Sequence, residues 1–305
     1  MHVLVARPPI EGNVCIGIAR SIESIRKTAG EREQTFAFEP PHELELRESG
    51  AKLLAGVSSL EASMADVHEH FPELQRVTMA SSLDQVTDGF MVVGPRGIQP
   101  SVLEEARERG IEVLNRSCPF VTSQEGYATK LVKDGYDLVF CGAAQQHGVP
   151  RIRDIAERAG KRFWIAEHSE DVAQIPRLGR VGVMAQTTQS LDNLQMVVAK
   201  LLEKCHEVKV VNSICGDSIP RQAAAREVAE QVDVVIVIGE SWGASRVAEV
   251  CKHVNARTYR AVSPKDLQSG WFAGAQTVGI APGNAVPAFM IDRFVAAIDT
   301  MSETG

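Results

Sequence analysis

The sequence lacks a CxxC array, a long apolar run and any excess of basic residues. Its six cysteines are spread over 305 residues, which argues for reduced thiols or metal ligands rather than a disulfide scaffold. No apolar stretch approaches the roughly 20 residues that cross a bilayer, and the first residues suit a strand rather than a signal peptide. A net charge of −7 offers no general attraction for nucleic acid or anionic membranes. We therefore expect a cytoplasmic protein that binds neither.

Aromatic residues are also scarce, at 5% of the chain, whereas 44% of the residues are hydrophobic. Short β-branched runs alternate with helical stretches, which indicates strands covered on both faces. The clearest expected strands are 90–93, 138–140, 181–184, 234–238 and 277–280. The clearest expected helices are 100–109, 151–159, 191–204, 244–253 and 287–301. This alternation predicts an α/β fold with small parallel sheets.

One cysteine stands at the same kind of junction in each third of the chain. Cys118 follows an expected strand and precedes a helix, Cys215 repeats that arrangement, and Cys15 is a looser copy. Unpaired amides and the helix dipole at such a junction favour the thiolate, which is the form that binds metal. Two interpretations stay open on spacing alone. The cysteines are three ligands of a four-iron cluster with one open iron, or they are three buried thiols of a repeated fold.

The repetition predicts three α/β units around a common centre. We expect unit boundaries of 1–96 with Cys15, 97–190 with Cys118, and 191–305 with Cys215 and a closing helix. Reactive groups lie outside the carboxyl ends of strands in open α/β sheets, so three units facing one centre would bring these cysteines together. The remaining cysteines are expected to pack as apolar residues: Cys141 in a strand, Cys205 at a helix end and Cys251 in a helix.

Five short motifs stand in order along the chain. They are Val14–Ile22, Ser117-Cys118-Pro119, Gln186-Thr187-Thr188, Ser213-Ile214-Cys215 with Arg221-Gln222, and Gly279–Gly283 with Pro287. Together they resemble the motifs of the 4-hydroxy-3-methylbut-2-enyl diphosphate reductase family, LytB/IspH. The resemblance implies a [4Fe–4S] cluster bound by Cys15, Cys118 and Cys215, with an open iron facing the substrate. It also implies an external electron donor such as ferredoxin or flavodoxin.

The chain departs from this family where the family holds and protonates its substrate. The family's Gly-His-x-x-His-x-Glu segment becomes 142–148, with Ala143 and Gln146 at the histidines and Gly148 at the glutamate. Arg96 stands at a phosphate-binding histidine. The family's Ser-Ser-Asn run becomes Gly243-Ala244-Ser245, and its late serine becomes Ala285. Losing the acid and most anion ligands together predicts a different substrate.

The remaining site residues each have a functional and an ordinary interpretation. By the resemblance, Thr187 stands beside the open iron as a hydrogen-bond donor, although it equally suits a cap for the helix near residue 190. His147 is the candidate replacement acid, or a solvated loop histidine. Arg96 suits a clamp for a carboxylate or phosphate, or a surface position. The residues expected to complete the substrate pocket are Gln146, Trp242 and Ser245.

We therefore expect a cluster-dependent oxidoreductase that removes or reduces an oxygen function of a small, non-isoprenoid anionic substrate. Non-redox cluster chemistry, either dehydration or sulfur transfer, is one alternative, and turnover without a reductant would favour it. The authentic diphosphate reductase reaction is a second alternative. A non-enzymatic iron–sulfur sensor is a third, although no basic DNA-contact face is evident.

Overall fold

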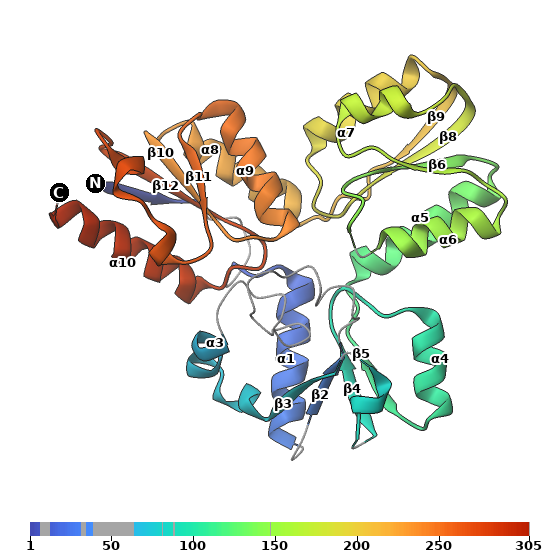
Figure 1. The fold of residues 1–305 in the computed structure, drawn as a ribbon, viewed down its shortest axis with the longest axis horizontal. Helices are drawn as coiled ribbons and strands as arrows, with labels where there is room; N and C mark the ends of the chain where they lie inside the picture. The colour runs from blue at the N-terminus through green and yellow to red at the C-terminus, as the bar shows by residue number, and fades with distance from the viewer. Residues whose placement is uncertain are drawn as a thin grey trace.

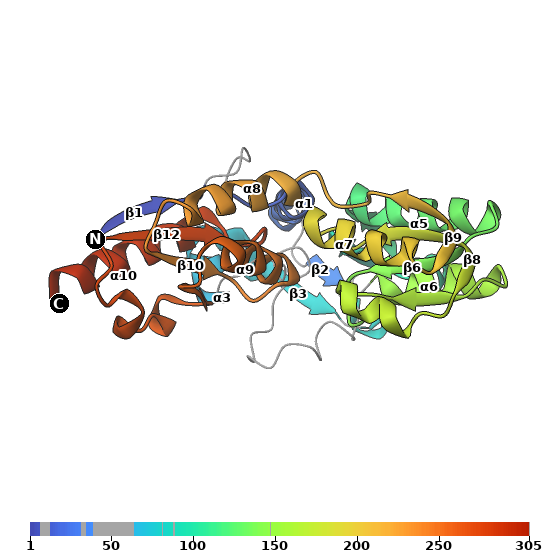
Figure 2. The ribbon, with the colours of Figure 1, turned by 90° about the horizontal axis from the view of Figure 1, so that it is seen from above.

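The computed structural model describes residues 1–6, 13–31, 35–38, 64–80, 82–87, 89–146 and 148–304. In these residues the strands form three separate four-stranded sheets, and every strand pair is parallel. Each sheet and its helices make one lobe of a three-lobed body (Figure 1). Seen from above, the body is flat (Figure 2). The predicted α/β class with small parallel sheets is confirmed.

The three sheets draw their strands from different parts of the chain. One sheet has the order β3 (Val77–Ala80), β2 (Thr35–Phe38), β4 (Phe90–Val93), β5 (Glu112–Asn115). The second has the order β7 (Phe163–Ile165), β6 (Asp137–Cys141), β8 (Leu178–Ala185), β9 (Cys205–Val211). The third has the order β11 (Thr258–Ala261), β10 (Val234–Ile238), β12 (Thr277–Pro282), β1 (His2–Val5).

The three sheets share one topology. In each, the first strand of the unit lies inside, the second lies at one edge, the third lies on the other side of the first, and a fourth strand forms the far edge. These fourth strands are β5, β9 and β1. Because the strands of a sheet run in one direction, each fourth strand delivers the chain to the carboxyl end of its sheet. The chain then continues into the first helix of another unit, which is α5, α8 or α1.

Sheet membership divides the chain differently from the boundaries expected at residues 96 and 190. β5 pairs with β4 although it lies beyond residue 96, and β9 pairs with β8 although it lies beyond residue 190. β1 pairs with β12 at the far end of the chain. In each case the fourth strand covers an otherwise open sheet edge. The residues of a short edge strand carry no signal for the sheet that the strand joins.

Helices cover both faces of each sheet. α1 (Ile16–Glu31) and α3 (Met64–His70) pack opposite α4 (Pro100–Glu108). α5 (Pro119–Lys133) and α6 (Val149–Arg158) pack opposite α7 (Leu191–Leu202). α8 (Ser218–Ala229) and α9 (Trp242–Val254) pack opposite α10 (Ala288–Thr304). The central strands β4 and β10 are therefore buried along their whole length, as their continuous apolar runs predict.

The helix and strand ends follow local chemistry. α9 begins two residues before its expected start because the Ser241 hydroxyl accepts a hydrogen bond from the Ala244 amide, at 3.2 Å. α6 begins at Val149 rather than Arg151, with Pro150 in its first turn. Cys205 is the first residue of β9, so its expected place at a helix end is wrong. No described helix combines the length and apolarity that a bilayer crossing requires.

Candidate metal centre

The three junction cysteines each lie beyond the carboxyl end of an edge strand. Cys118 follows β5 and is the residue that caps α5, whose first helical position is Pro119. Cys215 lies between β9 and α8, and Cys15 directly precedes α1. The equivalent junctions expected from the sequence are therefore present in all three units. α1 and α5 both begin near the middle of the three-lobed body (Figure 1).

The three thiols share one site. A Cβ added to Gly17 in the first turn of α1 would lie 2.8 Å from Cys118 Sγ, so only glycine leaves room for this thiol. A Cβ added to Gly216, beside Cys215, would lie 3.5 Å from the Phe120 ring, two residues after Cys118. Cys118 and Cys215 are also close enough to Cys15 to raise the pKa of its thiol.

Burial dominates the protonation of these thiols. It raises the pKa of Cys15 to about 12 and the pKa of Cys215 to about 11. Hydrogen bonds from helix-start amides act in the other direction: the Ile18 amide lowers the pKa of Cys15, and the Asp217 amide lowers that of Cys215. In the protein chain alone, desolvation thus outweighs the expected preference for thiolate. A bound cation reverses this balance because it stabilises the sulfur anion directly.

The turn Gln186-Thr187-Thr188 adjoins Cys215. The Thr187 carbonyl accepts hydrogen bonds from the Cys215 amide at 2.8 Å and from the Ser218 hydroxyl at 3.0 Å. The buried Gln186 side chain donates to the Thr188 hydroxyl at 2.8 Å, which tightens the turn. Thr187 itself is half-buried. The structure thus brings Thr187 to the cysteine site, whereas the cap of α7 is Ser190, whose hydroxyl accepts from the Asn193 amide.

Arg96 lies in the loop that follows β4 and holds Cys118. The carbonyl of the preceding residue, Pro95, accepts from the Cys118 amide at 2.8 Å. The carbonyl of Arg96 accepts from Arg151 Nη2 at 3.3 Å. Arg151 is buried and pairs with Glu125, with 2.6 Å between Nε and Oε1. Arg96 is half-buried beside this loop, so the structure places it near Cys118.

Gln146 and Gly148 lie close together in the segment where the family resemblance predicts the acid motif. Gln146 is buried, and its Oε1 accepts from the Gly148 amide at 2.8 Å. A Cβ added to Gly148 would lie 3.0 Å from the same oxygen, so a side chain there would displace Gln146. Ala143 is fully buried. His147 lies outside the described residues.

The start of α9 is packed against the loop that follows β12. A Cβ added to Gly243 would lie only 1.9 Å from Asn284 Oδ1, and one added to Gly283 would lie 3.0 Å from the Ala244 Cβ. Ala244 and Ala285 are both buried. The Asn284 carbonyl accepts from the Cys15 amide at 3.0 Å, so this loop also borders the cysteine site. Trp242 is 37% exposed. The Ser245 hydroxyl donates to the Ser241 carbonyl and accepts from Arg260 Nη1 at 3.1 Å.

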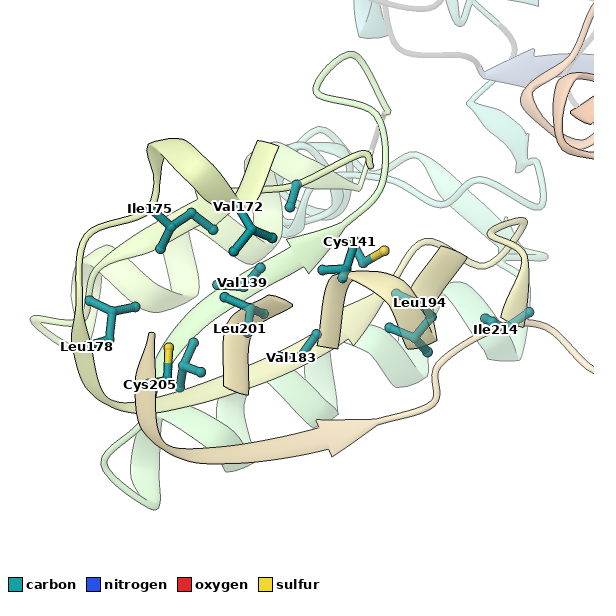
Figure 3. Packing of buried hydrophobic residues seen from close by; sticks show 14 residues of the cluster. Val139, Cys141, Val172, Ile175, Leu178, Val183, Leu194, Leu201, Cys205 and Ile214 are labelled. Atoms are coloured by element: carbon teal, nitrogen blue, oxygen red, sulfur yellow. The ribbon is translucent and has the colours of Figure 1, made fainter. Parts of the chain in front are cut away.

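The other three cysteines are packing residues, as expected. Cys141 and Cys205 belong to the apolar core between the second sheet and α7 (Figure 3). Cys251 is buried between α8 and α9. Burial raises the pKa of both Cys141 and Cys251 to about 12. The thiols of Cys141 and Cys251 are therefore protonated at neutral pH.

The junction cysteines are the kind of donor that holds iron–sulfur clusters. Among the described residues, no three His, Cys, Asp or Glu side chains are gathered as ligands of one metal ion would be. A four-iron cluster does not require this, because each cysteine binds a different iron. The Asp217 amide donates to Cys215 Sγ at 3.4 Å, which is the kind of hydrogen bond that stabilises a cluster thiolate.

Comparison with known proteins decides the family. The model of the family described as LytB protein matches residues 11–299. The chain belongs to the LytB family. A 4-hydroxy-3-methylbut-2-enyl diphosphate reductase from Trichlorobacter lovleyi is 30% identical over 307 residues, which cover 100% of both chains. The reductase of the same name from Geobacter sulfurreducens is 34% identical over 224 residues, covering 73% of this chain and 78% of that one. The LytB resemblance of the five motifs is thus confirmed.

Solved structures show that the chain has the LytB fold. A structure of (E)-4-hydroxy-3-methyl-but-2-enyl diphosphate reductase has a TM-score of 0.60 at 24% identity and covers 98% of this chain and 100% of its own. The Plasmodium falciparum E-1-hydroxy-2-methyl-but-2-enyl-4-diphosphate reductase has a TM-score of 0.76 at 18% identity, over 97% of this chain and 87% of its own. At these identities the likeness concerns the fold alone.

Three residues near the LytB cysteine site were missed in the sequence. Arg151 was expected only as the first residue of a helix, Arg221 only as part of a motif, and Asn284 was not considered. Their partners lie far along the chain: Arg151 reaches a carbonyl 55 residues away, and Arg221 reaches Asn13 across 208 residues. The sequence offers one chemical signal for such arginines. A buried arginine in the helical stretch after a cysteine motif needs hydrogen-bond acceptors, and these have to come from other parts of the chain.

Proposed function

We propose that this LytB protein is an iron–sulfur oxidoreductase in which Cys15, Cys118 and Cys215 bind a [4Fe–4S] cluster. When bound, such a cluster delivers electrons and offers a Lewis-acidic iron that no cysteine occupies. The electrons come from an external donor of the ferredoxin or flavodoxin type. The substrate is a small, non-isoprenoid anionic molecule, and the reaction removes or reduces one of its oxygen functions.

The contact between Gly243 and Asn284 is the observation that carries the substrate assignment. At this helix start the family resemblance expects a Ser-Ser-Asn run that holds a diphosphate. Here an added Cβ at Gly243 would lie 1.9 Å from Asn284 Oδ1, so the Asn284 amide fills that space. Ala244 and Ala285 are buried and carry no hydrogen-bond donor on their side chains. A diphosphate would therefore lose both room and hydrogen bonds in this site.

Arg96 supplies the positive charge of the proposed pocket. Two hydrogen bonds hold its loop. The Cys118 amide donates to the Pro95 carbonyl, and the Arg151 side chain donates to the Arg96 carbonyl. A guanidinium binds one carboxylate or one phosphate with two parallel hydrogen bonds. A single guanidinium therefore suits a substrate with a single anionic group, such as a carboxylate.

The other site residues orient the substrate and supply a proton. The Thr187 hydroxyl would donate a hydrogen bond to the substrate oxygen that reacts. The hydrogen bond from the Cys215 amide to the Thr187 carbonyl holds this residue beside Cys215. His147 would replace the glutamate that is absent at Gly148 as the proton donor. The side chains that would line the pocket without adding charge are Gln146, Trp242 and Ser245.

The cluster assignment is tested by six single serine substitutions. Serine at Cys15, Cys118 or Cys215 should remove or degrade the cluster in anaerobically purified protein, measured as iron and sulfide per chain. Serine at the buried Cys141, Cys205 or Cys251 is the matched control and should leave the iron content near that of wild type. A full cluster in all three junction variants would reject the assignment.

The substrate assignment is tested in a cell depleted of its own 4-hydroxy-3-methylbut-2-enyl diphosphate reductase. We expect no growth rescue by this protein, whereas the Trichlorobacter lovleyi relative should rescue growth under the same promoter. The relatives' shared name and full-length similarity favour the alternative that this chain is an authentic reductase. Rescue at ordinary expression would establish that alternative. Product formation without any reductant would instead favour non-redox chemistry.

A further inference from the structure

Arg221, in the first half of α8, uses its whole guanidinium inside the protein. Only 2% of its surface is exposed. Nε donates to Asp217 Oδ2 at 3.2 Å, Nη1 donates to Asn13 Oδ1 at 2.9 Å and to the Gly283 carbonyl at 3.3 Å, and Nη2 donates to the Asn13 carbonyl at 2.8 Å and to Asp217 Oδ1 at 3.2 Å. Each N–H of the arginine therefore has an acceptor.

Every acceptor of Arg221 belongs to a segment that holds a junction cysteine. Asn13 lies two residues before Cys15 and has a φ of 62°, in the left-handed region, where asparagine is tolerated. Its Nδ2 donates to the Val286 carbonyl at 2.8 Å, so its side chain is engaged on both polar atoms. Arg221 thus holds the turn that places Cys15 at the start of α1.

The other two acceptors act on Cys215 and again on Cys15. Asp217 is buried with Arg221, and its amide donates to Cys215 Sγ at 3.4 Å. Gly283 precedes Asn284, whose carbonyl accepts from the Cys15 amide at 3.0 Å. One side chain therefore joins the Cys15 turn, the Cys215 turn and the loop after β12, which come from different elements.

Arginine is the side chain that this position requires. A lysine keeps the charge but has three donors on one nitrogen, so it cannot reach acceptors spread around a planar fork. An uncharged side chain leaves the Asp217 carboxylate buried without its cation, and it leaves the acceptors of Asn13 and Gly283 unpaired. Either change releases the two cysteine turns from each other.

We propose that Arg221 is a positioning residue of the metal centre, which fixes the Cys15 and Cys215 turns at the separation that the cluster needs. This inference rests on the proposed cluster, and Arg221 acts through Asp217, Asn13 and Gly283, none of which is a proposed ligand. Residues that orient metal ligands from outside typically change metal affinity by about 10- to 100-fold when they are altered.

The test compares Arg221→Lys with Arg226→Met on the same helix. Arg226 has a side chain that is 40% exposed and pairs with Asp192, so its loss serves as the matched control. The paired change Arg221→Met with Asp217→Asn removes both buried charges together and leaves no unpaired ion. Each protein is first checked for folding by circular dichroism and thermal denaturation without metal.

Two readouts follow on the folded variants. The first is the rate at which an iron chelator removes the cluster, together with the EPR spectrum of the reduced cluster. We expect both Arg221 variants to lose iron about 10- to 100-fold faster than wild type and to give altered spectra, and the Arg226 control to match wild type. A purely structural role of Arg221 would lower the melting temperature without changing the spectrum.

The second readout needs no cluster and separates this inference from the proposed function. In Cys118→Ser protein without metal, dibromobimane becomes fluorescent only when both of its arms react with neighbouring thiols, here those of Cys15 and Cys215. We expect a lower fluorescence yield with Arg221→Lys and an unchanged yield with Arg226→Met. Wild type without bound iron would refute the proposed function, whereas equal bimane yields in all variants would refute the role of Arg221.

Discussion

Gly243 stands where the family resemblance predicts a residue that holds the substrate. It carries no side chain, and the Asn284 amide occupies the space where one would stand. We do not expect a larger residue at position 243 to be tolerated alone, because its side chain would collide with Asn284. Gly243 and Asn284 depend on each other, so we do not expect a change at one of them alone to restore the family's pocket.

We expect Gly243→Ser to destabilise the protein by about 1–3 kcal/mol, the usual cost of inserting atoms into a packed interior. Adding Asn284→Ala should recover most of that loss, because it empties the space that the serine needs. The measurement is the thermal midpoint of each protein without metal, analysed as a double-mutant cycle.

Gly126 in α5 is the matched control for this cycle. It is also a helical glycine, but a Cβ there would meet nothing within 4 Å. Gly126→Ser should change stability by less than about 0.5 kcal/mol. Additive effects of Gly243→Ser and Asn284→Ala would mean that the two residues do not compete for the same space.

At the residue scale the sequence predicts identities better than contacts. The junction cysteines and Thr187 could be named because each stands in a short local motif. The contacts of Arg221 could not, since its partner Asn13 is 208 residues away in the sequence. The place of Arg96 beside the Cys118 loop depends in the same way on Arg151, which lies in the next unit.

Among the elements, α9 is fixed to the second unit by a buried ion pair. Arg246 is 1% exposed, and it donates to Glu167 after β7 at 2.5 Å and to Glu249 in its own helix at 2.7 Å. The Glu167 carbonyl in turn accepts from Asn193 at the start of α7. This connection holds the helix that carries Gly243 against the lobe that carries Thr187.

We expect Arg246→Met to lower stability by about 3 kcal/mol, the lower end for breaking a buried pair, because Glu167 stays partly hydrated. Chemical denaturation of the protein without metal measures this loss. Arg158→Met is the control: that side chain is 80% exposed and pairs with Asp154, so its loss should be within about 0.5 kcal/mol of neutral. An equal loss of stability in Arg246→Met and Arg158→Met would show that the Arg246 ion pair does not fix α9 to the second unit.

Asp233 links two strands of the third sheet and makes their stability depend on pH. Its carboxylate accepts from the amides of Gln276 and Thr277 and from the Thr277 hydroxyl, and these hydrogen bonds hold its pKa below the usual value. A carboxyl with a depressed pKa stabilises the fold above its unfolded pKa of about 3.9. That contribution disappears as the pH falls through the lower, folded pKa.

We therefore expect Asp233→Asn to melt at a lower temperature than wild type at pH 7, with a difference that shrinks as the pH falls below about 4. Thermal denaturation at a series of pH values measures it. Asp154→Asn, which removes an exposed partner of Arg158, provides the baseline for a surface aspartate. A difference between wild type and Asp233→Asn that persists unchanged to pH 3 contradicts the assignment.

At the element scale, the sequence predicts where strands occur, but not which strands pair with one another. The apolar runs of β4, β8, β10 and β12 are fully or largely buried, as continuous hydrophobicity predicts. The edge strands gave no comparable signal of burial, because β5 is only two apolar residues between the exposed Glu112 and Asn115. The placement of β5, β9 and β1 follows from which sheet edge they close, and that is a property of the assembled fold.

On the scale of the whole molecule, β1 completes a sheet that is otherwise built from the last third of the chain. Removing residues 1–5 should expose the edge of β12 and leave the second sheet intact, because β1 pairs only with β12 among the described strands. Hydrogen exchange measures this directly. We expect faster exchange at the amides of Val278 and Ile280, and unchanged protection at Val139 and Val183 in the second sheet.

Loss of protection in all three sheets would instead mean that the units unfold together. A matched change at another edge strand distinguishes the cases: Leu114→Pro in β5 removes a ladder hydrogen bond in the first sheet, because its amide lies on the same side of the strand as those of Glu112 and Arg116, which donate to the carbonyls of Gly89 and Val93. It should raise exchange around β4 and leave Val278 and Ile280 protected.

The pairing of β1 with β12 also sets an order of events during synthesis. A ribosome makes the chain from its amino end, and early segments of a protein generally fold before later ones. Cys15 cannot settle in this way, because its amide is held by the carbonyl of Asn284 and its turn is held by Arg221. The turn of Cys15 thus reaches its folded position only after Arg221 and Asn284 have been made.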